Sequence, residues 1–188
     1  MTLAKVSMTN ADVPGWSLPS SDGTYPWGLE NTNRYLAGPA ADGNQWIVLG
    51  EASSNRNFTI QQTITGLTSG TKYTVTFDIA SELNCCAVGE VSMLSGSATG
   101  AQTYTAPSSG SYWTQWGLNS YTFIANASSA TIQFKDLVTG GNGYDLGLDN
   151  VQLMAGGVPE PTTWAVMLLG LAGIGGVARR RTAKAARA

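Results

Sequence analysis

Residues 71–81 (TKYTVTFDIAS) alternate apolar and polar side chains almost without interruption. Along an extended strand successive side chains point to opposite faces, so this alternation gathers the apolar residues on one side. A helix would scatter the same residues around its axis, and residues 1–156 show no helical period. The segment therefore predicts a half-buried strand, with one face that holds Tyr73, Val75, Phe77 and Ile79.

Further short segments have a strand-like composition and are separated by turns rich in Gly, Asn and Ser. They are residues 45–50, 58–64, 88–94, 119–125, 131–137 and 146–154. Seven or more short strands with such turns are typical of an all-β fold made of two packed antiparallel sheets. We therefore expect residues 1–156 to form one jelly-roll sandwich, which is long enough to bury a core.

The composition restricts the chemistry that this sandwich can perform. Charged residues make up 12% of the chain, about half of the usual quarter. Histidine is absent, which removes Ser-His-Asp and Cys-His nucleophile systems and most catalytic zinc sites. Eleven acidic and five basic side chains precede Val158, and the resulting net charge of −6 is unfavourable for binding phosphates. We expect neither an enzyme nor a nucleic-acid-binding protein.

The C-terminal part has the pattern of a membrane anchor. An uncharged run begins at Thr162 and ends at Ala178, and Arg179, Arg180 and Arg181 follow it. As a helix the run would span roughly 26 Å, close to the bilayer core of about 30 Å. The arginines place the C-terminus in the cytoplasm by the positive-inside rule. Residues 157–188 are therefore predicted to hold one transmembrane helix.

Val158, Pro159, Glu160 and Pro161 precede this run, and the basic residues close it. The order of these three parts resembles the PEP-CTERM sorting signal of exported proteins from Gram-negative bacteria that make exopolysaccharide. The resemblance implies that an exosortase in the membrane recognises the tail and cuts near the Pro-Glu-Pro motif. Glu160 would then be a recognition residue.

An exported protein needs a leader, yet residues 1–10 contain no apolar stretch of the length that a signal peptide requires. The sequence also begins abruptly before Val13-Pro-Gly-Trp16, a motif that usually follows a first strand in sandwich domains. We expect a leader peptide and an initial strand to precede Met1 in the natural protein.

The order of segments in residues 1–156 resembles the galactose-binding-like jelly roll of many non-catalytic carbohydrate-binding modules. The resemblance is carried by residues 13–16, 66–79, 116–125, 130–134 and 147–153. In calcium-containing members an acidic residue at the position of Asp149 helps to hold the ion, because Ca²⁺ prefers oxygen ligands. We expect no cofactor. A structural calcium ion at Asp149 is the one candidate that the resemblance implies, and the alternative is that Asp149 caps a turn that leads into the last strand.

Aromatic side chains suggest a sugar site, because flat rings stack on the apolar faces of pyranoses. Trp16 and Trp116 occupy positions where this fold normally buries an aromatic ring, and Trp46 fits either the core or the surface. The aromatic residues in loop-like contexts are the candidates for glycan binding, with packing in the core as the alternative. They are Tyr25, Trp27, Tyr112 and Trp113.

The two cysteines, Cys85 and Cys86, are adjacent in the sequence. A vicinal disulfide would close a small strained ring outside the usual disulfide geometry. Two free thiols and an intermolecular bridge are the alternatives. In each case we expect the pair to mark or stiffen a loop without catalytic chemistry.

Three functions fit these observations. We favour an exported non-catalytic protein that is anchored in the inner membrane with its body in the periplasm. After processing it would reach the cell surface or the extracellular matrix and associate with exopolysaccharide. The second function is a carbohydrate-binding module that recognises a specific glycan. The third is a glycosidase with two carboxylates about 5–10 Å apart, drawn from Glu51, Asp78, Glu82, Glu90 and Asp145.

Overall fold

The computed structural model describes residues 6–7, 15–17, 19, 27–31, 38–50, 58–83, 87–108, 112–137 and 145–156. The chain divides into two compact units, Met1–Ala155 and Gly156–Ala188. Apart from Gly156, every described residue belongs to the first unit. The predicted transmembrane helix, from Thr162 to Ala178, lies outside the described residues. Within the described ranges no helix has the length and apolar character needed to cross a membrane.

The described residues form eleven strands. The strands, in chain order, are β1 (Val6–Ser7), β2 (Trp16–Ser17), β3 (Trp27–Asn31), β4 (Gln45–Leu49), β5 (Thr59–Thr65), β6 (Lys72–Ser81), β7 (Val88–Ser95), β8 (Gln102–Thr105), β9 (Trp116–Ile124), β10 (Ser129–Asp136) and β11 (Leu146–Ala155). Each segment predicted from the sequence corresponds to one of these strands. The sequence pattern missed β1, β2, β3 and β8.

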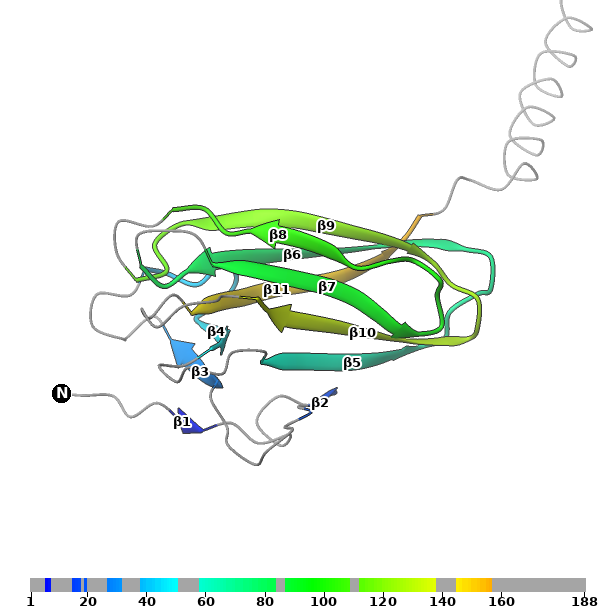
Figure 1. Ribbon diagram of the computed structural model, residues 1–188, viewed down its shortest axis with the longest axis horizontal. Coiled ribbons are helices and arrows are strands. Elements are labelled where there is room, and N and C mark those ends of the chain that lie inside the picture. The colour runs from blue at the N-terminus through cyan, green and yellow to red at the C-terminus, as the bar shows by residue number, and fades with distance from the viewer. Residues whose placement is uncertain are drawn as a thin grey trace, which may run out of the picture. The chain divides into compact units, whose positions relative to one another are not determined.

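The strands form two sheets, and all of the strand pairs are antiparallel. The six-stranded sheet has the order β1-β3-β4-β11-β6-β9, and the five-stranded sheet has the order β2-β5-β10-β7-β8. Figure 1 shows the long strands of the two sheets stacked as two layers. The expected all-β, two-sheet antiparallel sandwich is confirmed.

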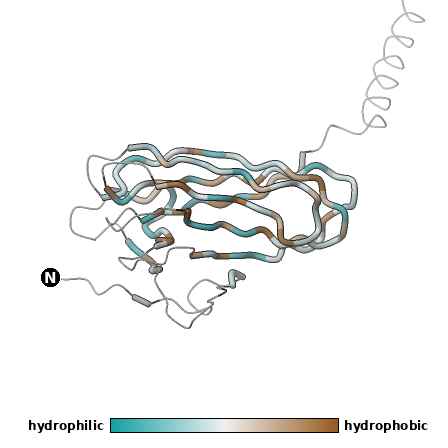
Figure 2. Tube along the Cα trace, in the orientation of Figure 1, coloured by the Kyte–Doolittle hydropathy of each residue, from teal (hydrophilic) through white to brown (hydrophobic). Residues whose placement is uncertain are grey.

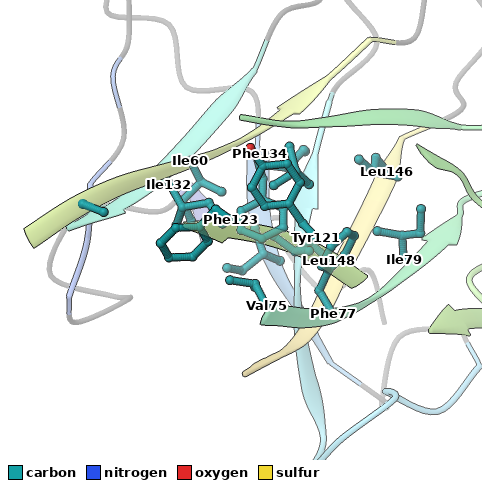
Figure 3. Close-up of a cluster of buried hydrophobic side chains, with 14 of the residues drawn as sticks. Ile60, Val75, Phe77, Ile79, Tyr121, Phe123, Ile132, Phe134, Leu146 and Leu148 are labelled. Carbon is teal, nitrogen blue, oxygen red and sulfur yellow. The ribbon is translucent and has the colours of Figure 1, made fainter. Parts of the chain in front are cut away.

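The main core lies between the two sheets. Tyr73, Val75, Phe77 and Ile79 are at most 7% exposed, so the face predicted from the alternation is confirmed. In Figure 3, Val75, Phe77 and Ile79 of β6 lie among side chains of β10 and β11, which include Phe134 and Leu148. The Phe77 ring lies 5.1 Å from the ring of Phe134 in an edge-on contact. Each such buried side chain contributes about 1.5–3 kcal/mol to stability.

A second apolar cluster covers the outer face of the six-stranded sheet. Along β4, Trp46 and Val48 alternate with the core residues Ile47 and Leu49, so they must point the other way. They are buried there together with Ala80 and Trp113, while Ala40, Tyr112 and Trp116 pack around them. Figure 2 shows the resulting alternation of hydrophobic and hydrophilic residues along the strands.

Two connecting segments close over this second cluster. The Trp116 indole N–H donates to the Pro39 carbonyl oxygen at 2.8 Å, and the Gly38 N–H donates to the Tyr112 carbonyl oxygen at 2.9 Å. A side chain at Gly147 would approach Trp113 Cδ1 to 2.8 Å, so glycine gives that indole its place on the sheet. The residues around 38–44 and 112–116 are therefore fixed to the outer face of this sheet.

Candidate functional site

The last strand, β11, departs from regular pairing in its middle. Its register with β6 shifts between Asp149 and Gln152. Asn150 has a φ of 51°, a left-handed conformation that asparagine adopts more readily than most residues with a side chain. Such bulges redirect side chains and are frequent beside functional sites. The pairing of β11 with β4 extends from Leu146 to Leu148, so the irregularity begins directly after the last paired residue.

Side-chain hydrogen bonds hold the bulge in place. The Asn150 amide donates to Asp78 Oδ2 at 2.9 Å, and the Gln152 amide donates to Asn150 Oδ1 at 2.5 Å. Asp78 is buried, so this bond supplies a donor to a carboxylate that has little contact with water. Three polar side chains on neighbouring strands thus fix the position of Asn150.

Asp149 connects the bulge to the segment that covers the sheet. Its Oδ1 accepts the N–H of Asn150 at 2.8 Å, and its Oδ2 accepts the N–H of Asp42 at 3.0 Å. Burial raises the pKa of Asp149, while the backbone N–H groups of Asp42, Asn150 and Ala41 lower it and the charge of Asp42 raises it. The burial effect is the largest, so the pKa lies above its ordinary value.

A cavity of about 310 Å³ lies beside this bulge. Aliphatic residues of β3, β4 and β11 form part of its wall. The rest of the wall is contributed by Trp16, Gln45, Trp46, Gln62, Asp149 and Asn150. The indole of Trp46 itself is buried in the second cluster, on the outer face of the six-stranded sheet. A wall with apolar surface and a few polar groups is typical of sites that bind small ligands. Both sheets contribute to it, because Trp16 and Gln62 belong to the five-stranded sheet.

Trp16 is the aromatic residue that connects the cavity with the main core. It is half-buried, and its ring lies 5.9 Å from the ring of Phe134. Its backbone pairs with Gln62 of β5, which fixes the indole against the sandwich. The prediction that Trp16 packs in the core agrees with this contact, but the sequence did not reveal its place in the cavity wall.

The predicted aromatic sugar site is not assembled by the described residues. Trp113 is 0% exposed, which agrees with the alternative that it packs in the core. Its backbone N–H reaches the carbonyl oxygens of Ser81 and Glu82, both at 3.3 Å, and the centre of its indole lies 5.8 Å from that of Trp46. Tyr112 is half-buried beside it, with the two ring centres 6.1 Å apart.

The remaining aromatic residues considered in the sequence analysis are two candidates for the sugar site and two tryptophans considered for the core. Tyr25 lies outside the described residues, and for Trp27 the structure gives the backbone position at the start of β3. Trp116 is half-buried within the second cluster, in agreement with the packing role predicted for it. Trp46, which the sequence left undecided, is 1% exposed.

Asp149 was also the candidate calcium ligand. The described residues contain no group of three or more acidic, histidine or cysteine side chains arranged to hold a metal ion. Both carboxylate oxygens of Asp149 accept backbone N–H groups, as in the alternative that it caps a turn. A calcium ion at Asp149 stays a prediction.

Two of the carboxylate residues considered for a glycosidase are neighbours, because the Glu82 N–H donates to the Asp145 carbonyl oxygen at 3.0 Å. Asp78, Glu82 and Asp145 are buried, whereas Glu90 is half-buried on β7. Asp149 is the carboxylate among the described residues of the cavity wall. Glu51, Cys85 and Cys86 lie outside the described residues, as do the sorting residues from Val158 to Pro161 and from Arg179 to Arg181.

Two family models match the chain. Residues 2–147 match the family described as protein of unknown function (DUF642). The chain belongs to this family. Residues 157–181 match the PEP-CTERM protein-sorting motif, which confirms the resemblance carried by Val158, Pro159, Glu160, Pro161 and the three arginines. No curated protein matches the chain in sequence.

Several solved structures are similar to this DUF642 chain. The enzymatically active domain of tailspike protein 4 from bacteriophage CBA120 has 15% identity and a TM-score of 0.53, over 79% of this chain and 21% of that one. TmCBM61 in complex with β-1,4-galactotriose has 15% identity and a TM-score of 0.49, over 76% and 89%. CBM35 from Paenibacillus barcinonensis has 21% identity and a TM-score of 0.49, over 76% and 94%. The chain spans about a fifth of the tailspike chain, and that likeness shows a shared fold.

Proposed function

We propose that this DUF642 chain is an exported, non-catalytic protein that binds glycans at the cavity beside the β11 bulge. In this proposal an exosortase processes the PEP-CTERM tail, and the β-sandwich is displayed outside the inner membrane in contact with exopolysaccharide. The observation that carries the binding proposal is the cavity wall, where the half-buried Trp16 occurs together with the amide residues Gln45, Gln62 and Asn150. The sorting motif supports the proposed location.

The chemistry of this wall suits a sugar ring. A pyranose has an apolar face of C–H groups and a rim of hydroxyl groups, each of which donates and accepts hydrogen bonds. An indole such as that of Trp16 offers a large apolar surface. The amides of Gln45, Gln62 and Asn150 both donate and accept, which matches hydroxyl groups. The volume of about 310 Å³ lies at the lower end of the usual range for ligand sites, about 300–1,000 Å³.

The position of Asp149 supports binding without cleavage. Glycosidases that use two carboxylates place them on opposite sides of the scissile bond, with one free to move a proton. Both oxygens of Asp149 instead accept hydrogen bonds from the backbone, which suits a structural role. We therefore infer that the cavity holds a saccharide and leaves it intact.

Calorimetric titration of the protein with a panel of oligosaccharides tests the binding proposal. Gln45→Ala and Gln62→Ala should each weaken binding of a positive ligand about fivefold to tenfold, because each removes a hydrogen bond. Gln133→Ala is the matched control, since Gln133 lies on β10 and alternates with the core residues Ile132 and Phe134. Equal affinity of all three variants, or no binding across the panel, would contradict the proposal.

Expression of the full chain in strains with and without an exosortase tests the sorting proposal. We expect the mature protein to lose its tail and leave the membrane fraction in the first strain only. Glu160→Ala should prevent this processing if Glu160 is a recognition residue, whereas Glu90→Ala should not. An identical mass and location in both strains would contradict exosortase processing.

A further inference from the structure

One aspartate belongs to the wall of the cavity beside the β11 bulge, and two others are joined to wall residues by hydrogen bonds. Asp149 belongs to the cavity wall. Asp42 is joined to it by a backbone hydrogen bond of 3.0 Å, and Asp78 is joined to the wall residue Asn150 by a bond of 2.9 Å. Building on the glycan-binding function proposed above, we propose that this cavity selects uncharged saccharides and rejects those that carry a carboxylate, such as uronic acids.

Described basic side chains lie far from this acidic group. They are Lys72 and Lys135. Lys72 lies on β6 six residues from Asp78, which corresponds to about 20 Å along a strand. Lys135 alternates with the core residue Phe134 and therefore points outward from the five-stranded sheet. At about 0.15 M salt the Debye length is about 8 Å, so neither lysine offsets the charge at the cavity.

The hydrogen bonds of the carboxylates reduce this negative charge without cancelling it. Asp149 accepts from two backbone N–H groups and Asp78 accepts from an amide, and all of these donors are neutral. The charge of Asp42 is also felt at Asp149, because it contributes to the raised pKa of that group. A second anion in the cavity would meet the same repulsion.

Hydroxyl and carboxylate groups on a sugar respond to this field in opposite ways. A hydroxyl group can donate a hydrogen bond to a carboxylate, whereas the ionised carboxylate group of a uronate has no hydrogen to donate. Two like charges about 6–8 Å apart repel each other, and at an effective dielectric constant of about 20–40 this repulsion lowers the affinity for the charged ligand roughly tenfold to a hundredfold. The acidic group therefore discriminates by charge while it leaves neutral sugars free to bind.

A substitution at Asp42 can change the charge near the cavity without removing a hydrogen bond to Asp149. Its side chain is exposed, and its bond to Asp149 is made by the backbone N–H. Asp42→Asn therefore removes one negative charge and keeps that hydrogen bond. Glu90→Gln is the matched control, because it makes the same change in net charge on β7 of the other sheet.

The experiment uses pairs of oligosaccharides of equal length that differ only in oxidation at C6. Galacto-oligosaccharides are compared with oligogalacturonates, gluco- with glucurono- and manno- with mannurono-oligosaccharides, by calorimetry at pH 7 and low salt. We expect the neutral member of a binding pair to bind at least about tenfold more tightly. Asp42→Asn should narrow this difference at least threefold through tighter uronate binding, and Glu90→Gln should leave it unchanged.

The outcomes separate this inference from the glycan-binding proposal. A uronate that binds as tightly as its neutral counterpart overturns the charge selection and leaves glycan binding in place. A difference that Asp42→Asn does not alter overturns the assignment of selection to the acidic group. Binding of no pair removes the glycan-binding function itself, and the inference with it. Equal thermal melting curves of the variants show that the fold is preserved.

Discussion

Gly50 and Asp149 show how single residues shape the region around the last strand. Gly50 follows the last residue of β4 and has a φ of 119°, in the region that residues with a side chain rarely adopt. Asp149 fixes the turn of the bulge to the neighbouring segment through two backbone hydrogen bonds. In both places the backbone conformation depends on one residue type, so a single substitution should change the local structure.

Gly50→Ala should destabilise the protein by about 2–4 kcal/mol, through backbone strain and steric overlap. The added Cβ would lie 2.8 Å from Asp145 Oδ1 and 3.0 Å from Asp136 Oδ2, and both carboxylates are buried. Urea unfolding measures the change. Gly100→Ala is the control, because nothing lies within 4 Å of a Cβ at Gly100. An equal effect of the two substitutions would contradict this account.

The raised pKa of Asp149 predicts a dependence of stability on pH. Between its ordinary value of 3.8 and the raised value, the folded state binds more protons than the unfolded state. The contribution of this group is therefore greatest below pH 3.8 and is lost as the pH rises through the raised pKa. Asp149→Asn should lack this decline. Urea unfolding of both proteins from pH 3.5 to pH 7 measures it, and parallel pH profiles would contradict the prediction.

At the scale of the elements, the edge of the six-stranded sheet formed by β9 is protected. The strand β9 has one pairing partner, β6, and would offer its other edge to a second molecule. The hydroxyl group of Tyr104 donates to the Ser120 carbonyl oxygen on this edge at 2.8 Å. Pro107 packs close to Gly117 of the same strand, 3.0 Å from the place of a Cβ. The neighbouring β8 region thus covers an edge that could otherwise pair.

Tyr104→Phe should weaken this protection. The change removes one hydroxyl group, leaves the Ser120 carbonyl without that donor, and should cost about 0.5–1.5 kcal/mol of stability. We also expect greater self-association, because an exposed edge strand is a template for pairing. Thermal melting and light scattering measure the two effects. Unchanged values in both would show that the hydroxyl does not protect the edge.

Whether a strand could be predicted from the sequence depends on its position in the sheet. The strand β6 has two partners and one core-facing side, so burial enforces the alternation that the sequence displays. The strand β8 is a four-residue edge strand with Tyr104 as its one large apolar side chain, and its short sequence carries no period. The signal for a strand therefore grows with the number of residues that must face the core.

At the scale of the whole molecule, the sandwich and the sorting tail are separate units. The division falls between Ala155 and Gly156, directly after β11. All of the strand pairing described above occurs within the first unit. The motif that is matched at residues 157–181 lies in the second. The sandwich should thus fold independently of the tail.

A chain that ends at Gly156 should therefore keep the fold of the sandwich. We expect the same far-ultraviolet circular dichroism per residue of the sandwich and a melting temperature within about 2 °C of the full chain, a difference of less than about 1 kcal/mol. The full chain in detergent is the reference. A lower melting temperature or loss of the β-sheet signal would show that the tail contributes to the stability of the sandwich.

The amino-acid sequence by itself determined the features that depend on local pattern. The alternation in β6 fixed the class of fold and its buried face, and the Pro-Glu-Pro motif with its basic end identified the sorting tail. The tertiary structure decided the features that depend on distant contacts. In the folded protein Trp113 is buried, and Trp16 and Asn150 line the same cavity. Periodicity records which way a side chain points, whereas only packing between sheets decides what covers it.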